Sequence, residues 1–204
     1  MAKQTIIYLV RHGESELNKQ RIIGGHVDSV LTEKGKEQVR QTKLALKNIH
    51  FDEVYSSDLK RAVHTAEILY GKAIPEAHKV SALRERSFGA LEGKPEHLYI
   101  KGNVERQKLT HEEGWLFKHV PDMESDHELS TRYIPALEKV AKDNLGRTIL
   151  IAAHGSAIRT TIMKLTGFTY TDLPAGTFGN AGYTELTYDE DQGLKVIQIN
   201  GVKL

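Results

Sequence analysis

A continuous β-prone run, Thr5–Val10, stands near the start of the chain and is followed at once by the charged residues Arg11 and His12. Because apolar residues occupy successive positions of this run, it is typical of a strand buried on both faces, as in a parallel sheet. Two further β-prone runs, 53–57 and 148–153, each precede a helix-forming stretch. This repeated strand-then-helix order predicts an α/β three-layer sandwich, with a mostly parallel central sheet and helices on both faces.

Capping residues predict where several helices begin and end. We expect Thr32 to cap a helix that runs to about Asn48, and Asp58 to cap the next helix along the chain. A later helix is expected to begin near Ser156 and to stop at Gly167, because glycine readily adopts the left-handed conformation that ends helices.

The remaining segments complete a single domain over residues 1–204. Residues 183–188 and 194–200 are separated by turn-forming residues and predict a closing pair of strands. The segment from about 95 to 126 is polar and is interrupted by glycine and proline, which predicts a small, partly helical insertion. Two interpretations of this insertion stay open, a lid over a site and a surface excursion without a catalytic role.

Composition excludes several classes of protein. The chain has 204 residues, a formal net charge of +1 and no cysteine, so disulfides, thiolate nucleophiles and cysteine-ligated zinc are excluded. A near-neutral charge argues against a protein built for long nucleic-acid contacts. The apolar stretch Ile6–Val10 is too short for a signal-peptide core, and no stretch has membrane-spanning length. A cytoplasmic location, with no nucleic acid or membrane as partner, is therefore the expectation.

Polar residues suited to phosphate chemistry follow the predicted strands. Arg11 and His12 end the first strand, Arg61 lies one turn into the helix after the second, and His154 follows the 148–153 run. Ligands of open α/β sheets bind beyond the carboxyl ends of the strands, so we expect these side chains to meet. Any one of these residues by itself is more often an ordinary structural or surface residue. The functional interpretation depends on their occurring together at the predicted strand ends.

This set of side chains matches the needs of phosphoryl transfer. A phosphate dianion requires fixed positive charge, and arginine supplies planar forks that match its oxygens. A neutral imidazole is a competent nucleophile near pH 7. We expect Gly13 and Gly155 to let the backbone pass close to the ligand, and the helix near Ser156 to direct its free N–H groups at an anion.

Several motifs resemble those of the histidine phosphatase superfamily, the group that includes phosphoglycerate mutase. They begin with Arg-His-Gly-Glu-Ser at 11–15 and appear in the family's order along nearly the whole chain. The matching segments are 11–18, 25–32, 56–67, 83–93, 153–155 and 180–186.

The resemblance implies a role for each matching residue. His12 would be the nucleophile that becomes phosphorylated, and Arg11, Arg61 and His154 would hold and neutralise the phosphoryl group. Glu85 would be the general acid that protonates the leaving oxygen and then the base that activates water. The substrate-binding positions implied in the same way are Asn18, Gly25 and Gly155. The implied activity is that of a metal-independent, acid-type phosphatase without a cofactor, which hydrolyses phosphomonoesters of small molecules.

Some positions depart from the family's pattern and leave the substrate open. Ile22 and Ile23 stand where an arginine is often found, so Arg21 is read as displaced. The other departures are Gly24, His64, Ser87 and Phe88. Sugar phosphates, nucleotide-like phosphates, phosphorylated amino acids and protein phosphate all stay open, as does the oligomeric state, with a homodimer among the options.

Three alternatives to a phosphatase are disfavoured by the sequence. A phosphoglycerate mutase must retain a bisphosphate, and the insertion has Lys101, Arg106 and Lys108 but neither the paired arginines nor the proline run of the mutases, so hydrolysis is favoured. A non-catalytic binding protein on this fold is disfavoured because all five core positions are filled. A metal site is disfavoured because the histidines lack compact ligand spacing, and 111–113 and His119 are read as insertion surface.

Overall fold

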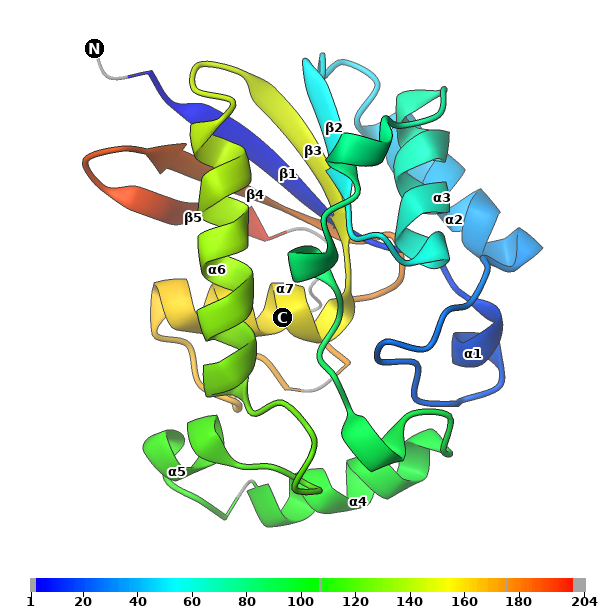
Figure 1. The fold of residues 1–204 in the computed structure, drawn as a ribbon, viewed down its shortest axis with the longest axis vertical. Helices are drawn as coiled ribbons and strands as arrows, with labels where there is room; N and C mark the ends of the chain where they lie inside the picture. The colour runs from blue at the N-terminus through cyan, green and yellow to red at the C-terminus, as the bar shows by residue number, and fades with distance from the viewer. Residues whose placement is uncertain (1–2, 107, 175, 200–204) are drawn as a thin grey trace.

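A computed structural model of the chain describes residues 3–106, 108–174 and 176–199. Its sheet has five strands in the order β2-β3-β1-β4-β5 (Figure 1). The strands are β1 (Thr5–Arg11), β2 (Glu53–Ser56), β3 (Thr148–Ala153), β4 (Tyr183–Asp189) and β5 (Gly193–Ile199). β1, β2 and β3 are parallel, β4 is antiparallel to β1, and β5 is antiparallel to β4. Four of these strands therefore run in one direction, which confirms the mostly parallel sheet. The predicted end of the last strand, Asn200, lies outside the described residues.

Helices cover both faces of the sheet because alternate residues of its strands point in opposite directions. Ile7 and Leu9 of β1 belong to a buried cluster with apolar residues of α6 and α7. Val10 belongs to a second cluster, with residues of α2 and α3. The four helices are α2 (Glu33–Ala45), α3 (Lys60–Tyr70), α6 (Asp126–Lys142) and α7 (Gly155–Thr166). These two clusters confirm the α/β three-layer sandwich.

Of the three predicted capping residues, Thr32 and Gly167 are confirmed. The Thr32 side chain accepts a hydrogen bond from the Gly35 amide and caps α2, which ends at Ala45. Gly167 ends α7 in the left-handed conformation, at φ 75°. The prediction that Asp58 caps α3 was wrong, because Leu59 holds that position without a side-chain hydrogen bond. The Asp58 carboxylate is instead engaged by the Arg84 guanidinium through two hydrogen bonds, at 2.7 and 2.6 Å.

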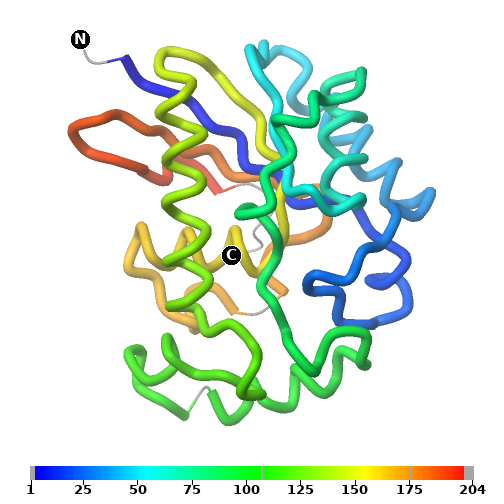
Figure 2. Tube along the Cα trace, in the orientation of Figure 1, coloured from blue at the N-terminus to red at the C-terminus, as the bar shows by residue number. Residues whose placement is uncertain are grey.

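The segment 95–126 forms two helices, α4 (Glu96–Arg106) and α5 (His111–Leu116), followed by a loop. Figure 2 traces this segment along the end of the molecule away from the N-terminus, below α6 and α7. Arg106 is buried and ion-paired with Asp126, the first residue of α6, which ties α4 to the main domain. The remaining elements are the short helix α1 (Glu16–Lys19) and 3-10 turns at Glu76–His78, Ser81–Leu83 and Gly89–Leu91.

His119 was wrongly predicted to lie on the surface of the insertion, and Arg106, predicted only as one of its cations, is buried as well. Arg106 is only 3% exposed. His119 is half-buried among aromatic rings, 4.4 Å from the ring centroid of Tyr99 and 5.0 Å from that of Phe117. Burial, with Arg106 and Arg86 nearby, lowers the pKa of His119 to about 4. In the described part of the chain, no helix is both long and apolar enough to cross a membrane.

Candidate active site

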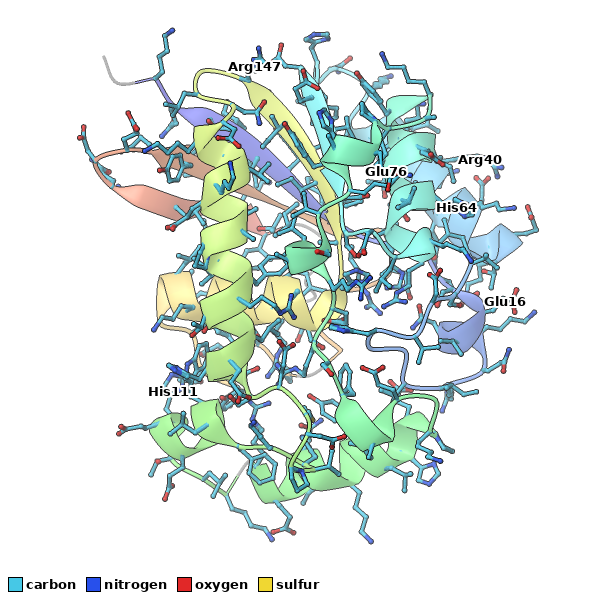
Figure 3. All side chains as sticks on the ribbon, viewed as in Figure 1. Glu16, Arg40, His64, Glu76, His111 and Arg147 are labelled. Atoms are coloured by element: carbon cyan, nitrogen blue, oxygen red, sulfur yellow. The ribbon has the colours of Figure 1, made fainter. Side chains whose placement is uncertain are left out.

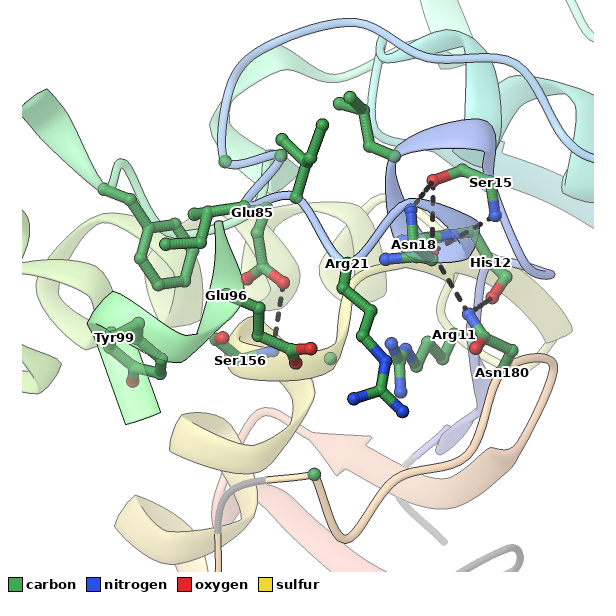
Figure 4. A pocket seen from close by; sticks show the side chains of 18 of the residues that line it. Arg11, His12, Ser15, Asn18, Arg21, Glu85, Glu96, Tyr99, Ser156 and Asn180 are labelled. Atoms are coloured by element: carbon green, nitrogen blue, oxygen red, sulfur yellow. Dashed lines mark hydrogen bonds between the residues drawn. The ribbon is translucent and has the colours of Figure 1, made fainter. Parts of the chain in front are cut away.

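A cavity of about 360 Å³ opens beyond the carboxyl ends of the parallel strands (Figure 4). Its walls come from the end of β1, the loop 15–25, the first turns of α3 and α7, and α4. Seven of the eight predicted site residues line it, namely Arg11, His12, Asn18, Gly25, Arg61, Glu85 and Gly155. The eighth, His154, is fully buried directly behind it, with its ring centroid 5.2 Å from that of His12.

His12 is held in an orientation suited to nucleophilic attack. Its Nδ1 lies 2.7 Å from the carbonyl oxygen of Gly13. Because a carbonyl can only accept, Nδ1 carries the proton and Nε2 keeps its lone pair. The ring is 4% exposed, and burial together with the charges of Arg61 and Arg11 lowers the pKa of His12 well below its usual value. The imidazole is therefore neutral and nucleophilic at physiological pH.

His154 lies at the N-terminus of α7 with both ring nitrogens buried. Neither nitrogen has a hydrogen-bond partner among the described residues. Burial, followed by electrostatic interactions with Arg61, His12 and Arg11, lowers the pKa of His154. Burying a polar group without a hydrogen-bond partner costs free energy. An anion in the cavity would supply a partner for His154.

The two predicted phosphate-binding arginines are fixed by backbone carbonyls. Arg61 donates from Nη1 to Val27 at 2.8 Å and from Nη2 to Gly25 at 2.6 Å. Arg11 donates from Nη1 to the Phe178 carbonyl, while its Nε has no partner among the described residues. Burial lowers the pKa of both guanidinium groups, which remain charged at any physiological pH.

Gly25 acts through Arg61, because its carbonyl holds that guanidinium. Its backbone is in the left-handed region, at φ 52°, and a Cβ there would lie 2.2 Å from Oε1 of Glu92. That Glu92 oxygen accepts hydrogen bonds from the amides of His26 and Phe88, so it has little freedom to move. Glycine is thus required at this position for local geometry.

Gly13 has a different role from the one predicted. A Cβ at this position would lie 2.4 Å from the carbonyl oxygen of Gly35 on α2. The close approach is therefore between the strand end and α2, and not between the backbone and a ligand. At Gly155, an added Cβ would lie 3.2 Å from Nε of Arg11, so glycine there leaves room for the arginine side chain.

The side chain of Glu85 lies against the N-terminus of α7, where we expect the free N–H groups to face an anion of the ligand. Its Oε2 accepts from the Ser156 amide at 3.1 Å, and its Oε1 accepts from the Ala157 amide at 3.0 Å. The Arg86 amide donates to the same Oε1 at 2.8 Å. The helix N-terminus is thus used to orient a carboxylate of the chain itself. Figure 4 shows Glu85 bonded to Ser156 at the cavity wall.

Asn18 belongs to a small network beneath the cavity. Its Oδ1 accepts from the amide and hydroxyl of Ser15, both at 3.1 Å, and completes the N-terminal cap of α1. Asn180 donates to the His12 carbonyl at 3.2 Å and to the same Asn18 oxygen at 3.4 Å. Asn180 lies in the matching segment 180–186, for which the resemblance implied no site residue, and the structure places it against the backbone of His12.

Other residues of the cavity were not predicted as site residues. Arg21 lines it, although its position suggested displacement from the family's pattern. Arg159 comes from α7, and Glu96, Tyr99 and Asn103 come from α4. Arg159 lies four residues after Gly155, the spacing of one helix face, and this spacing is a signal from which it could be predicted. No local pattern indicated which face of the insertion would meet the site.

The cavity carries an excess of positive charge. Four arginines and two glutamates line it, and the two histidines are neutral. The excess of two positive charges matches a phosphate dianion, which the set of arginine forks and neutral imidazoles is suited to bind.

Comparisons with known proteins agree with this geometry. The family model of the histidine phosphatase superfamily (branch 1) matches residues 7–200. A 2,3-bisphosphoglycerate-dependent phosphoglycerate mutase of Parvibaculum lavamentivorans is 33% identical over 172 residues, which cover 78% of this chain and 79% of that protein.

Two solved structures with different activities in their names share the fold. A phosphoglycerate mutase from Bacillus anthracis superposes with a TM-score of 0.80 at 27% identity, covering 97% of this chain and 93% of its own. A phosphoserine phosphatase from Entamoeba histolytica, in complex with phosphoserine, superposes with a TM-score of 0.79 at 27% identity, covering 96% of each chain. From the family match and the mutase relative, we conclude that the chain belongs to branch 1 of the histidine phosphatase superfamily.

Proposed function

We propose that the chain is a metal-independent phosphatase that hydrolyses phosphomonoesters of small molecules through a phosphohistidine on His12. The observation that carries the proposal is the state of His12, a buried, neutral imidazole whose Nδ1 proton is held by Gly13. The free Nε2 then belongs to a cavity that also contains Arg11 and Arg61.

In the first step, Nε2 of His12 attacks phosphorus and the bond from phosphorus to the ester oxygen breaks. Arg11, Arg61 and His154 stabilise the charge on the phosphoryl oxygens, the role of fixed donors in phosphoryl transfer. The departing oxygen takes a proton from Glu85, which the N-terminus of α7 holds at the cavity wall.

In the second step, water attacks the phosphohistidine and gives its proton to Glu85. The bond from phosphorus to nitrogen breaks, His12 is regenerated, and inorganic phosphate leaves. The same carboxyl group thus serves as acid and then as base, which returns the site to its starting state.

Hydrolysis is favoured over mutase activity by the wall that the insertion contributes. α4 gives the cavity a carboxylate, Glu96, and no cation among its described residues. Lys101 and Lys108 are exposed and do not line the cavity. Arg106 is engaged by Asp126, and Lys118 is ion-paired with Glu128 away from the cavity lining. The insertion therefore offers no cationic surface that would retain a bisphosphate while it reorients in the site.

Mutase activity is the second candidate, because relatives on the same fold are named phosphoglycerate mutases. Incubation with 3-phosphoglycerate and a trace of 2,3-bisphosphoglycerate, followed by phosphorus NMR, separates the two. We expect inorganic phosphate as the product. Accumulation of 2-phosphoglycerate without inorganic phosphate would establish the mutase instead.

The role of Glu85 is tested by Glu85→Gln with two leaving groups. With the poor alkoxide of glycerol 3-phosphate, phosphoryl transfer should slow by about 10²- to 10⁴-fold, the usual range for a lost general acid. With nitrophenyl phosphate, the leaving group needs little protonation, so transfer to His12 should be nearly preserved. Hydrolysis of the phosphohistidine then lacks its base, and rapid quench should show a burst of nitrophenol followed by slow turnover.

The control is Glu76→Gln, which removes an exposed carboxylate far from the cavity (Figure 3) and should change neither rate. If Glu85 only caps α7, Glu85→Gln should cause a small loss, equal for both substrates and without a burst. That pattern would contradict its role as acid and base, provided that circular dichroism shows a folded variant.

A further inference from the structure

His26 is a half-buried histidine whose side chain does not line the cavity. Its Nε2 lies 2.8 Å from the main-chain carbonyl oxygen of Glu85. Because a carbonyl oxygen can only accept a hydrogen bond, Nε2 carries a proton and donates it. The hydrogen bond joins residues 59 positions apart in the chain, so it links a distant loop to the proposed acid and base. The mechanism described above gives His26 no role.

The chain neighbours of His26 hold a phosphate-binding arginine. The carbonyl of Gly25 accepts from Nη2 of Arg61 at 2.6 Å, and the carbonyl of Val27 accepts from Nη1 at 2.8 Å. Three consecutive residues therefore engage two functional groups. The main chain at 25 and 27 holds the guanidinium, and the side chain at 26 holds Glu85. The segment 25–27 thus ties the group that binds the phosphoryl oxygens to the group that handles the proton.

Glu85 is held from its other side by two helices. Arg132 of α6 donates from Nη2 to the Glu85 carbonyl at 3.1 Å and from Nη1 to the Ala82 carbonyl at 2.8 Å. The amides of Ser156 and Ala157 in α7 hold the Glu85 carboxylate. These contacts fix Glu85 relative to α6 and α7, whereas His26 fixes it relative to the loop that holds Arg61.

The main chain of His26 is itself held in place. Its amide donates to Oε1 of Glu92 at 3.0 Å, and the amide of Phe88 donates to the same oxygen at 3.0 Å. The imidazole therefore extends towards Glu85 from a fixed position. A catalytic group must be held within about 0.5 Å of its productive position by the groups behind it, and His26 has the contacts for such a role.

We propose that His26 is a positioning residue, which holds Glu85 at the distance from the bound phosphoryl group at which its carboxyl group reaches the ester oxygen. Because its side chain does not line the cavity, His26 acts on the reaction through Glu85 and not by contact with the substrate. This inference rests on the phosphatase activity proposed above and adds a residue to its mechanism.

The test is His26→Phe, which removes the hydrogen-bond donor and keeps a ring. With glycerol 3-phosphate, kcat should fall by about 10- to 100-fold, since a displacement of about 1 Å in a catalytic group can cost 10²-fold. With nitrophenyl phosphate, the burst of nitrophenol should keep nearly its wild-type rate, because this leaving group needs little protonation. Inhibition by inorganic phosphate should stay unchanged, because main-chain carbonyls hold Arg61.

Two further variants separate positioning from general support of the fold. His26→Gln keeps an N–H donor at the end of the side chain and should restore most of the activity on glycerol 3-phosphate. His26→Phe should have almost no further effect in a Glu85→Gln background, because two residues that act through one group are not additive. The matched control is His64→Phe, which replaces a half-buried histidine of α3 outside the cavity lining (Figure 3) and should change neither rate.

An unchanged kcat for glycerol 3-phosphate in a folded His26→Phe variant would overturn the proposal. Equal losses for both substrates, together with weaker inhibition by phosphate, would also overturn it, since His26 would then only support the loop around Arg61. If His26→Phe does not fold, His26→Ala takes its place with the same expectations.

Failure of the phosphatase itself has a different signature, with no turnover of either substrate by the wild-type protein and no phosphohistidine. Crystal structures of the wild-type protein and of His26→Phe would then decide the question. We expect the Glu85 carboxylate to be displaced in the variant, and a carboxylate that keeps its place would overturn the positioning role.

Discussion

Replacing Asp126 with asparagine should destabilise the domain strongly, because this buried carboxylate joins three elements. It receives Arg86 from the segment after Glu85 and Arg106 from α4, and it lies at the start of α6. Although burial alone would raise the pKa of Asp126, the charges of Arg86 and Arg106 hold it below the usual value of 3.8. The carboxylate is therefore ionised wherever the protein is folded near neutral pH.

The expected loss follows from what asparagine can replace. Its amide oxygen still accepts, but its NH₂ group faces arginine donors and cannot accept from them. The arginines would then be buried without any ionic partner in the cluster. Removing one member of a buried ion pair costs about 3–5 kcal/mol. That is a large share of the roughly 5–15 kcal/mol by which domains are stable.

Urea denaturation at pH 7 measures the change directly. With an m-value of about 3 kcal/mol/M, the midpoint should fall by about 1–2 M. The control is Asp143→Asn, which breaks an exposed pair with Lys139 and should cost less than about 1 kcal/mol. Because the pKa of Asp126 is depressed, its stabilisation is present above pH 3.8 and is lost as the pH falls below that value, so the two proteins should converge in acid. A loss below about 1 kcal/mol at pH 7 would refute this account of the cluster.

Three further predictions concern the site and the insertion. His12→Ala should lower phosphatase activity by several powers of ten in a folded protein, and near-normal turnover would contradict a covalent role. Activity should survive EDTA, since arginines take the role that a metal plays elsewhere, and loss on chelation reversed by one divalent ion would contradict this. Because the pKa of His119 is lowered to about 4, protonation opposes folding, and stability should fall as the pH drops from 6.5 towards 4. We expect the free energy of unfolding, measured in urea at pH 7 and pH 4.5, to differ less between the two pH values in His119→Phe than in the wild-type protein. An equal difference in both proteins would contradict the assignment.

Predictions from the sequence held where short-range physics decides the outcome. The Thr32 cap and the Gly167 stop each depend on a few neighbouring residues and were both found. The alternation of strands and helices also predicted the layers. Because parallel strands share one carboxyl edge, the ends of β1, β2 and β3 were expected to meet, and Arg11, His12, Arg61 and His154 do gather there.

Those predictions failed where charged residues pair with groups that lie far away in the sequence. Asp58 has the residue type of a helix cap, but Arg84, 26 positions along the chain, binds its carboxylate more strongly than a helix amide would. The free amides of α7 were expected to meet an outside anion, and Glu85 reaches them from 71 positions away. Arg106 was predicted only as a cation of the insertion, and its buried ion pair with Asp126 was not predicted.

The sequence alone was thus enough to predict the α/β sandwich and the edge of the sheet where Arg11, His12, Arg61 and His154 gather, because strand periodicity and capping act over a few residues. Tertiary structure was needed to show the position of Glu85 on α7 and the burial of Arg106 beside Asp126. Each of these depends on which charged groups are buried together. Burial magnifies an electrostatic interaction that a local pattern cannot reveal.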